Sequence, residues 1–144
     1  TDMTTTEKTI ITIETTVNAS PEKVWKVWNS PEDIVVWGTA HPDWHTPRAE
    51  NDIRTGGKFL YRMEAKDGSF GFDFGGVYDA VKPNEYIEYT IGDGRKVTID
   101  FKTTGNQVHI VETFEAESQN PVEMQRAGWQ AILDNFKKHT ESLS

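Results

Sequence analysis

The sequence predicts an α+β fold in which a curved antiparallel sheet wraps around one long C-terminal helix. From Arg48 to Ala116, apolar and polar residues alternate between short turn sequences, as in an antiparallel sheet that is packed on one face. After Asn120 the apolar spacing becomes helical, and such a helix must bury its stripe against the sheet. The expected order is one strand, two short helices, about six strands and the long helix, in a single domain spanning residues 1–144.

The first 38 residues are expected to hold one strand and two short helices. Residues 9–17, TIITIETTV, are rich in β-branched side chains and predict the strand. Ser20 is a good N-cap, and Pro21 suits the first position of a helix. Ser30 and Pro31 repeat this start signal, so a second short helix is expected to run up to Gly38.

The segment from Arg48 to Ala116 is expected to form the strands of a meander. Tight turns rich in Gly, Asp, Asn and Pro recur along it, at residues 66–68, 82–84, 92–94 and 104–106. Gly75 and Gly76 interrupt one of the strands, and we expect a bulge or a sharp bend at this point.

The last element is expected to be a long helix that begins near Asn120. Asn120, Pro121 and Glu123 are typical of a capping box with proline at the first helical position. The stripe at helical spacing consists of Val122, Gln125, Trp129, Ile132, Leu133 and Phe136. Gly128 costs a helix interior about 1 kcal/mol relative to alanine, so we expect another element to approach it closely.

The charge balance and the absence of long apolar stretches exclude several classes of partner. The chain has 15 Lys and Arg against 23 Asp and Glu, and its net charge of −8 repels nucleic-acid phosphates. No stretch approaches the roughly 20 apolar residues that span a bilayer. The chain has no cysteines, which excludes disulfides and thiolate chemistry. We therefore expect a cytoplasmic protein, a monomer or weak homodimer, that binds neither nucleic acid nor membrane.

Four local motifs, together with the element order, resemble a known superfamily. The motifs are ASPEKVWKVWNSPEDIVVW after the first strand, GGKF at 56–59, GVY at 76–78 before a proline turn, and Gly128-Trp129 in the last helix. With these motifs the chain is similar to the START-like, Bet v allergen-like (SRPBCC) superfamily, in its activator-of-Hsp-ATPase homologue (AHSA-type) branch. The resemblance covers nearly the whole chain and implies the helix-grip fold, β-α-α-β6-α.

The resemblance also implies a mostly apolar cavity between the sheet and the long helix. Characterised relatives bind lipophilic small molecules in this cavity, while others act as cyclases, stress-response proteins or co-chaperone domains. A shared fold does not decide among these functions. Three functions therefore remain open, namely small-molecule binding, a cyclase or hydrolase activity, and stimulation of a chaperone ATPase. We expect a binding protein rather than an enzyme.

The segment AHPDWHTPRAEND, residues 40–52, carries the pattern that is nearest to a metal site. His41, Asp43 and His45 alternate, and alternate side chains of an extended backbone share one face. Two imidazoles and a carboxylate would suit zinc or iron(II). Two prolines make the path irregular, however, and the spacing is no specific metal signature. We favour a connecting segment whose His41, Trp44 and His45 form the rim of a pocket, with no metal and no cofactor.

Glu112 is the best single candidate for acid/base catalysis. It occupies an apolar-parity position between Ile110 and Phe114, so its carboxyl group is expected to face the interior. Burial in an apolar cavity would raise the pKa of this carboxyl group unless a cation pairs with it. An internal ion pair, or a bulge that turns Glu112 outward, are the alternatives, and the sequence leaves them open.

Large aromatic residues are numerous for a chain that is 35% hydrophobic, with five Trp, four Tyr and seven Phe. They either fill the core completely or leave a ligand cavity of roughly 300–1,000 Å³ with a few polar anchors. We expect a cavity that binds a planar or lipophilic small molecule. The candidate ligand-binding residues are Trp37, His41, Trp44, His45, Phe59, Tyr61, Met63, Phe72, Phe74, Tyr78, Tyr89, Phe101, Phe114, Met124, Gln125, Trp129 and Ile132.

Overall fold

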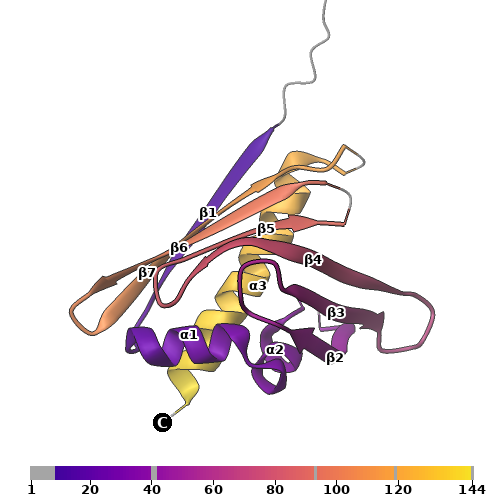
Figure 1. Cartoon of the computed structure of the whole chain (residues 1–144). Helices are drawn as coiled ribbons and strands as arrows, with labels where there is room; N and C mark the ends of the chain where they lie inside the picture. Colours follow the sequence, from indigo (N-terminus) through magenta and orange to yellow (C-terminus); the bar gives the residue numbers. More distant parts are fainter. Residues whose placement is uncertain (1–8, 40–41, 93, 119, 144) are drawn as a thin grey trace, which may run out of the picture.

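One seven-stranded antiparallel sheet curves around the C-terminal helix in the computed structural model of the chain (Figure 1). The structure describes residues 9–39, 42–92, 94–118 and 120–143. The elements are β1 Ile10–Val17, α1 Pro21–Asn29, α2 Pro31–Trp37, β2 Trp44–Asn51, β3 Lys58–Ala65, β4 Gly71–Lys82, β5 Tyr86–Ile91, β6 Lys96–Thr104, β7 Gln107–Glu115 and α3 Val122–Ser142. The strand order β1-β7-β6-β5-β4-β3-β2 is a meander to which β1 is added beside β7. The predicted helix-grip arrangement is therefore confirmed.

The two short helices start where the serine–proline pairs predict. The Ser20 hydroxyl accepts a hydrogen bond from the backbone N–H of Lys23 at 3.2 Å, which is the expected N-cap. Ser30 is also an N-cap, although its side chain makes no capping bond to α2. The indole N–H of Trp37 donates to the carbonyl oxygen of Val27 at 3.1 Å, which ties α2 to α1. Figure 1 shows both helices at one end of the sheet, beside the C-terminal half of α3.

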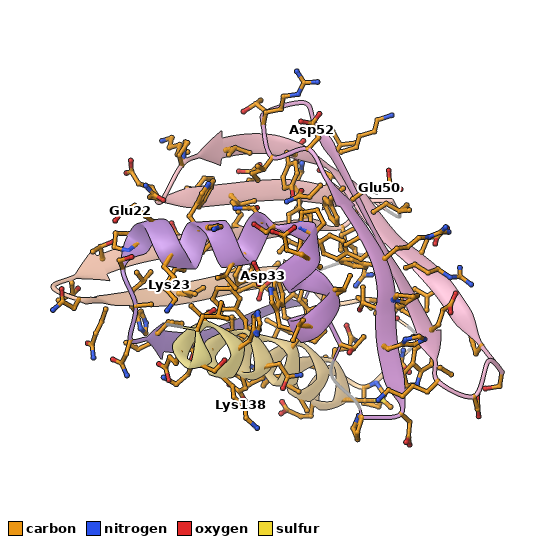
Figure 2. All side chains as sticks on the ribbon, turned by 90° about the horizontal axis from the view of Figure 1, so that it is seen from below. Glu22, Lys23, Asp33, Glu50, Asp52 and Lys138 are labelled. Carbon is orange, nitrogen blue, oxygen red and sulfur yellow. The ribbon has the colours of Figure 1, made fainter. Side chains whose placement is uncertain are left out.

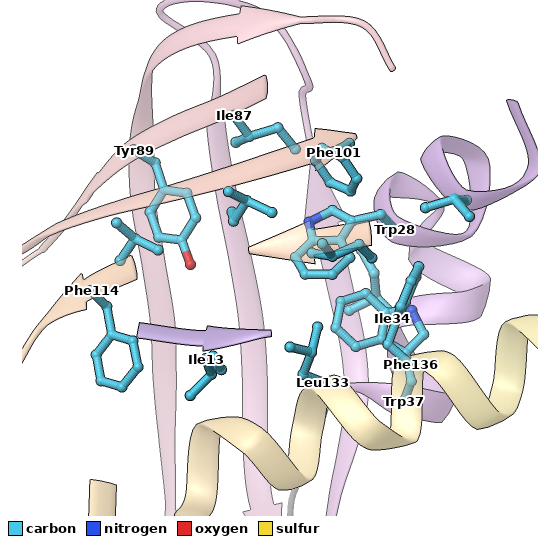
Figure 3. Close-up of a cluster of buried hydrophobic side chains, with 14 of the residues drawn as sticks. Ile13, Trp28, Ile34, Trp37, Ile87, Tyr89, Phe101, Phe114, Leu133 and Phe136 are labelled. Atoms are coloured by element: carbon cyan, nitrogen blue, oxygen red, sulfur yellow. The ribbon is translucent and has the colours of Figure 1, made fainter. Parts of the chain in front are cut away.

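The concave face of the sheet carries the apolar core. Inward positions on β5, β6 and β7 are buried, as their alternation predicts. Figure 3 shows side chains from these strands meeting those of α1, α2 and α3, among them Trp28, Trp37 and Phe136. Figure 2 shows charged side chains such as Glu50 and Lys138 extending outward from this core. Among the described residues, no helix combines the length and the apolar character needed to cross a membrane.

The irregularities of the sheet lie at other places than the sequence predicts. β2 already begins at Trp44, and its register with β3 shifts between His45 and Arg48. The register of β4 with β5 shifts between Tyr78 and Ala80, whereas the pairing with β3 is regular through Gly75 and Gly76, so the expected bulge does not lie at these two glycines. A Cβ on Gly76 would clash with the carbonyl oxygen of Thr90 on β5, so this glycine permits a close backbone approach.

The start of α3 also differs from the prediction. Pro121 is the N-cap residue and makes no side-chain cap bond, so the expected capping box is absent from the described helix start. Glu117 instead accepts a hydrogen bond from the backbone N–H of Asn120 at 2.6 Å. The Gln125 amide donates to the carbonyl oxygens of Glu117 and Asn120, at 3.1 and 2.8 Å. This glutamine therefore closes the turn that precedes α3.

Gly128 lies in the interior of α3 with open space beside it. Apart from the adjoining residues and the backbone of the helix itself, no atom of the described residues would come within 4 Å of a Cβ added there, so the predicted close approach was wrong. On both sides of Gly128 in the sequence, polar side chains of α3 cover the open edge of β1. Side chains four and then seven residues apart donate to alternate carbonyl oxygens of β1: Arg126 to Thr12 at 3.2 Å, Gln130 to Glu14 at 3.3 Å and Lys137 to Thr16 at 2.6 Å.

Candidate functional site

A cavity of about 380 Å³ lies between the concave face of the sheet and α3. Four tryptophans, three phenylalanines and three tyrosines account for most of its wall, and Glu112 contributes the one carboxyl group found among the described lining residues. The complete lining is Trp28, Trp37, Gly38, Thr39, Trp44, Phe59, Tyr61, Met63, Phe72, Phe74, Tyr78, Ile87, Tyr89, Glu112, Trp129, Ile132 and Leu133. The wall is therefore aromatic with a few polar groups, as in small-molecule pockets.

Aromatic contacts hold the wall together. The ring of Phe59 lies 5.2, 5.3 and 4.7 Å from the rings of Tyr61, Tyr78 and Tyr89, measured between centroids. On the helix side, Trp129 stacks against Phe114. Contacts of this kind add about 0.5–1.5 kcal/mol each beyond the area that they bury. The rings thus keep fixed positions around the cavity.

Glu112 faces the cavity from β7. The register of β7 is regular on both sides, with Glu112 opposite Ile13 of β1 and Ile99 of β6, so no bulge turns it outward. Its side chain is 6% exposed. Burial raises the pKa of the Glu112 carboxyl group to about 8. Among the described residues, no cation or hydrogen-bond partner contacts this carboxyl group, and it is therefore largely protonated at neutral pH.

Tyr89 brings a second polar group to the same space. Figure 3 shows its hydroxyl group directed from β5 toward the space above α3. Burial, and next the charge of Glu112, hold the pKa of the Tyr89 hydroxyl well above its usual value. Because the charge of Glu112 acts on Tyr89, the carboxyl group and the hydroxyl group are close enough to interact electrostatically.

The other two tyrosine hydroxyls belong to a chain of hydrogen bonds. The hydroxyl of Tyr78 donates to Oδ1 of Asn51 on β2. The Asn51 amide in turn donates to the backbone oxygen of Asn29 at 2.9 Å, at the end of α1. Because Tyr78 gives its proton to Asn51, its hydrogen bond with Tyr61 has Tyr61 as the donor. The proton of Tyr61 is therefore already engaged.

The cavity meets the surface near Trp44 and Thr39. Both residues also line a second, more open hollow that contains His45, Lys66 and His139. The ring of Trp44 lies 5.9 Å from each of the rings of Phe70 and Phe72. Phe70 and Phe72 are both exposed, so an aromatic cluster borders the mouth of the cavity.

Eleven of the candidate ligand-binding residues line the cavity. They are Trp37, Trp44, Phe59, Tyr61, Met63, Phe72, Phe74, Tyr78, Tyr89, Trp129 and Ile132. The sequence reasoning missed Trp28, Gly38, Thr39, Ile87 and Leu133. Leu133 belongs to the predicted helical stripe, and Trp28 and Ile87 are apolar residues within predicted elements, so periodicity could have found all three, whereas Gly38 and Thr39 carry no such signal.

Five candidates lie outside the cavity wall. Met124 is 63% exposed on the first turn of α3, and Gln125 is engaged in the turn before this helix. Phe101 packs edge-on against the rings of Trp25 and Trp28, within the core. Phe114 lies behind Trp129, and His45 lines only the outer hollow.

The candidate metal pattern is not assembled within the described part of the chain. His41 lies outside the described residues. Nε2 of His45 lies 3.8 Å from a carboxylate oxygen of Glu64 on the surface. Across residues 9–39, 42–92, 94–118 and 120–143, no three His, Asp or Glu side chains are grouped so that they could hold a metal ion.

Comparison with known proteins gives matches along nearly the whole chain. The family model described as "Activator of Hsp90 ATPase homolog 1-like protein" matches residues 18–141. The solution structure of the AHSA1-like protein from Aeromonas hydrophila is 40% identical, with a TM-score of 0.87 and 93% of each chain covered. The solution structure of Chr148 from Cytophaga hutchinsonii is 60% identical, with a TM-score of 0.80 and 91% of each chain covered.

A more distantly related structure is similar to the chain in its fold alone. The crystal structure of CV1439 from Chromobacterium violaceum is 23% identical, with a TM-score of 0.83, 94% of this chain covered and 99% of that chain. No curated protein matches the chain.

Proposed function

The chain belongs to the family of Activator of Hsp90 ATPase homolog 1-like proteins, and from this premise we propose that it binds a lipophilic or aromatic small molecule in the cavity between the sheet and α3. The observation that carries the proposal is the cavity itself, about 380 Å³ in volume and walled by ten aromatic residues. Cavities that bury small ligands have this size and this composition.

The contacts of the wall support the proposal. A core without a ligand is normally packed to the density of an organic crystal, and an empty apolar space lowers stability. Here the rings contact one another around the space instead of filling it, as Phe59 does with its three tyrosine neighbours. A planar apolar ligand would recover the missing contacts and remove its own surface from water.

Dye binding with two matched variants tests the proposal. Ile132 lines the cavity and Met124 is exposed, and both lie on α3. The uncharged dye 6-propionyl-2-(dimethylamino)naphthalene and a library of neutral aromatic compounds would be screened by fluorescence and by thermal shift. We expect compounds that raise the melting temperature of the wild type and of Met124→Phe. Ile132→Trp, which fills the cavity, should lose this effect.

Two results would contradict cavity binding. One is a library in which no compound raises the melting temperature of the wild type. The other is a set of hits that bind the folded Ile132→Trp variant as tightly as they bind the wild type, because such binding would occur at another surface.

A second candidate function is an enzyme of cyclase or hydrolase type that uses Glu112. The pKa of about 8 favours it, since a general acid or base works best with a pKa near the working pH. Tyr89 is the partner available in the cavity, whereas His45 lies in the outer hollow. On a substrate found by screening, Glu112→Gln should abolish turnover with the fold intact. An unchanged rate would remove Glu112 from the mechanism.

The family description supports a third candidate, the stimulation of a chaperone ATPase. The ATPase rate of the cognate chaperone would be measured with and without the protein. A rate that rises in proportion to the added protein would support this function, and a rate that is unaffected at saturating concentrations would exclude it.

A further inference from the structure

Two polar groups in the cavity are buried without a partner. The side chains of Glu112 and Tyr89 are 6% and 8% exposed. Within the described residues, no hydrogen bond reaches the carboxyl group of Glu112 or the hydroxyl group of Tyr89. Buried polar groups are almost always hydrogen-bonded, and an unpaired one destabilises the folded state. The presence of two in one cavity therefore indicates that their partner comes from outside the chain.

The other hydroxyl groups of the wall cannot serve as donors to a ligand in the same way. The proton of Tyr61 is used by Tyr78, and that of Tyr78 is used by Asn51. The structure thus separates the tyrosines into a bonded pair, Tyr61 and Tyr78, and one free hydroxyl, that of Tyr89. Glu112 and Tyr89 reach the cavity from β7 and β5, with β6 between them.

No cation stands against Glu112 on any element that surrounds it in the described structure. The neighbouring strands present Ile13 on β1 and Ile99 on β6, and α3 presents apolar side chains to the cavity. The titratable groups that face the cavity are Tyr61, Tyr78 and Tyr89. Arg95 acts electrostatically on Tyr89 and is bonded to the backbone oxygen of Glu115. The carboxyl group is thus kept neutral and carries an O–H donor.

We propose that the cavity selects a neutral lipophilic ligand with a hydrogen-bond acceptor such as a carbonyl oxygen, which the carboxylic acid of Glu112 and the hydroxyl of Tyr89 bind as donors. This inference rests on the proposed function, since it specifies what the cavity binds. An anionic ligand is disfavoured because the described wall offers no cation to pair with it. A ligand without an acceptor leaves both donors unpaired.

Three probes with one three-ring frame test the inference, namely fluorene, 9-fluorenone and fluorene-9-carboxylate. They carry no acceptor, a neutral acceptor and an anion, respectively. Dissociation constants would be measured by equilibrium dialysis at pH 6.5. We expect 9-fluorenone to bind roughly three- to tenfold more tightly than fluorene, the range of one net hydrogen bond, and the carboxylate to bind most weakly. At pH 9.5 the preference for 9-fluorenone should fall, because ionised Glu112 has no proton to donate and only the hydroxyl of Tyr89 remains as a donor.

Two variants distinguish the effect of the hydrogen-bond donor at position 112 from the effect of the size of the side chain. Glu112→Gln keeps an N–H donor that does not titrate, so the preference for 9-fluorenone should persist at pH 6.5 and at pH 9.5. Glu112→Met has a similar length and no donor at this position, so its preference for 9-fluorenone over fluorene should be reduced. Binding of fluorene reports an intact cavity in each variant. If Glu112→Met no longer binds fluorene, the test relies on Glu112→Gln, whose preference for 9-fluorenone should be the same at both pH values.

The outcomes separate this inference from the proposed function. Equal affinity of the wild type for fluorene and 9-fluorenone at pH 6.5 would overturn the inference and leave cavity binding intact. Tightest binding of the carboxylate would also overturn it. A wild-type preference that does not change with pH would remove Glu112 as the donor. If none of the three probes binds, cavity binding fails and this inference fails with it.

Discussion

The indole of Trp129 stacks on the phenyl ring of Phe114, with 4.0 Å between the ring centroids and 11° between the ring planes. This contact joins the middle of α3 to the inward face of β7, two residues from Glu112. Trp129 lines the cavity, whereas Phe114 lies behind it in the core. The stack therefore links the stability of the helix–sheet contact to the position of one wall of the cavity.

A double-mutant cycle should measure this stack. Trp129→Leu and Phe114→Leu each remove one ring, and each is expected to lower the free energy of unfolding by a few kcal/mol, roughly as other large-to-small core changes do. The loss in the double variant should be about 0.5–1.5 kcal/mol smaller than the sum of the two single losses, because each single variant already loses the same stacking contact. As a control, Trp25 contacts Phe101 instead, so Trp25→Leu combined with Phe114→Leu should be additive.

Gly128 offers a route to a more stable helix. A Cβ at this position of α3 meets open space, so Gly128→Ala should raise the free energy of unfolding by about 0.5–1 kcal/mol. Denaturant unfolding measures the change. The matched control is Gly76→Ala, where the Cβ would clash with a backbone oxygen of β5, and a clear loss of stability is expected. A destabilised Gly128→Ala would show that another contact constrains this turn of the helix.

These two glycines also show where sequence reasoning about the fold ends. Periodicity predicted the order of all the elements, because apolar alternation and helical spacing act locally along the chain. Whether a neighbour approaches a glycine depends on strand register and helix placement, which are tertiary features. The approach was expected at Gly128 and occurs instead at Gly76, opposite Thr90.

The candidate site shows the same division between local and tertiary information. Parity assigned Glu112 to the apolar face of its strand but left open a bulge that would turn it outward, and the regular register with β1 and β6 excludes that bulge. Gln125 also lies on the predicted stripe, but its amide bonds to the backbone of the turn at 117–120. Periodicity assigns a face to a residue but does not identify its hydrogen-bond partner. The free hydroxyl of Tyr89 and the engaged one of Tyr61 could not be told apart for this reason.

Removing the hydroxyl of Tyr78 should weaken the contact between α1 and the sheet. In Tyr78→Phe, the side-chain oxygen Oδ1 of Asn51 loses its hydrogen-bond donor, and the hydroxyl of Tyr61 loses its acceptor. Leaving such groups unpaired should lower the free energy of unfolding by about 1–3 kcal/mol. The control Tyr86→Phe removes a hydroxyl that donates to Glu88 of the same strand, so a smaller loss is expected. Equal losses in the free energy of unfolding of the two variants would show that the buried chain of hydrogen bonds through Tyr78 does not stabilise the fold.

The pH dependence of stability should reveal the buried carboxyl group of Glu112. Its pKa is about 8 in the folded protein against an ordinary value of 4.5, so the folded state keeps a proton that the unfolded chain releases. Stability must therefore fall as the pH rises between these two values, by about 1.4 kcal/mol per pH unit from this one group. The contribution is fully present below pH 4.5 and is lost once the pH has passed 8.

Comparison with Glu112→Gln isolates this contribution, because glutamine has the same shape and does not titrate. Free energies of unfolding would be measured with denaturant at pH 5, 6, 7, 8, 9 and 10. The free energy of unfolding of Glu112→Gln should increase relative to that of the wild type with each step in pH, and the difference should level off above pH 8. Glu50→Gln, on the exposed face of β2, is the control for the removal of a surface carboxylate. A difference between Glu112→Gln and the wild type that does not change with pH would mean that a cation, or water that enters the cavity, compensates the carboxylate.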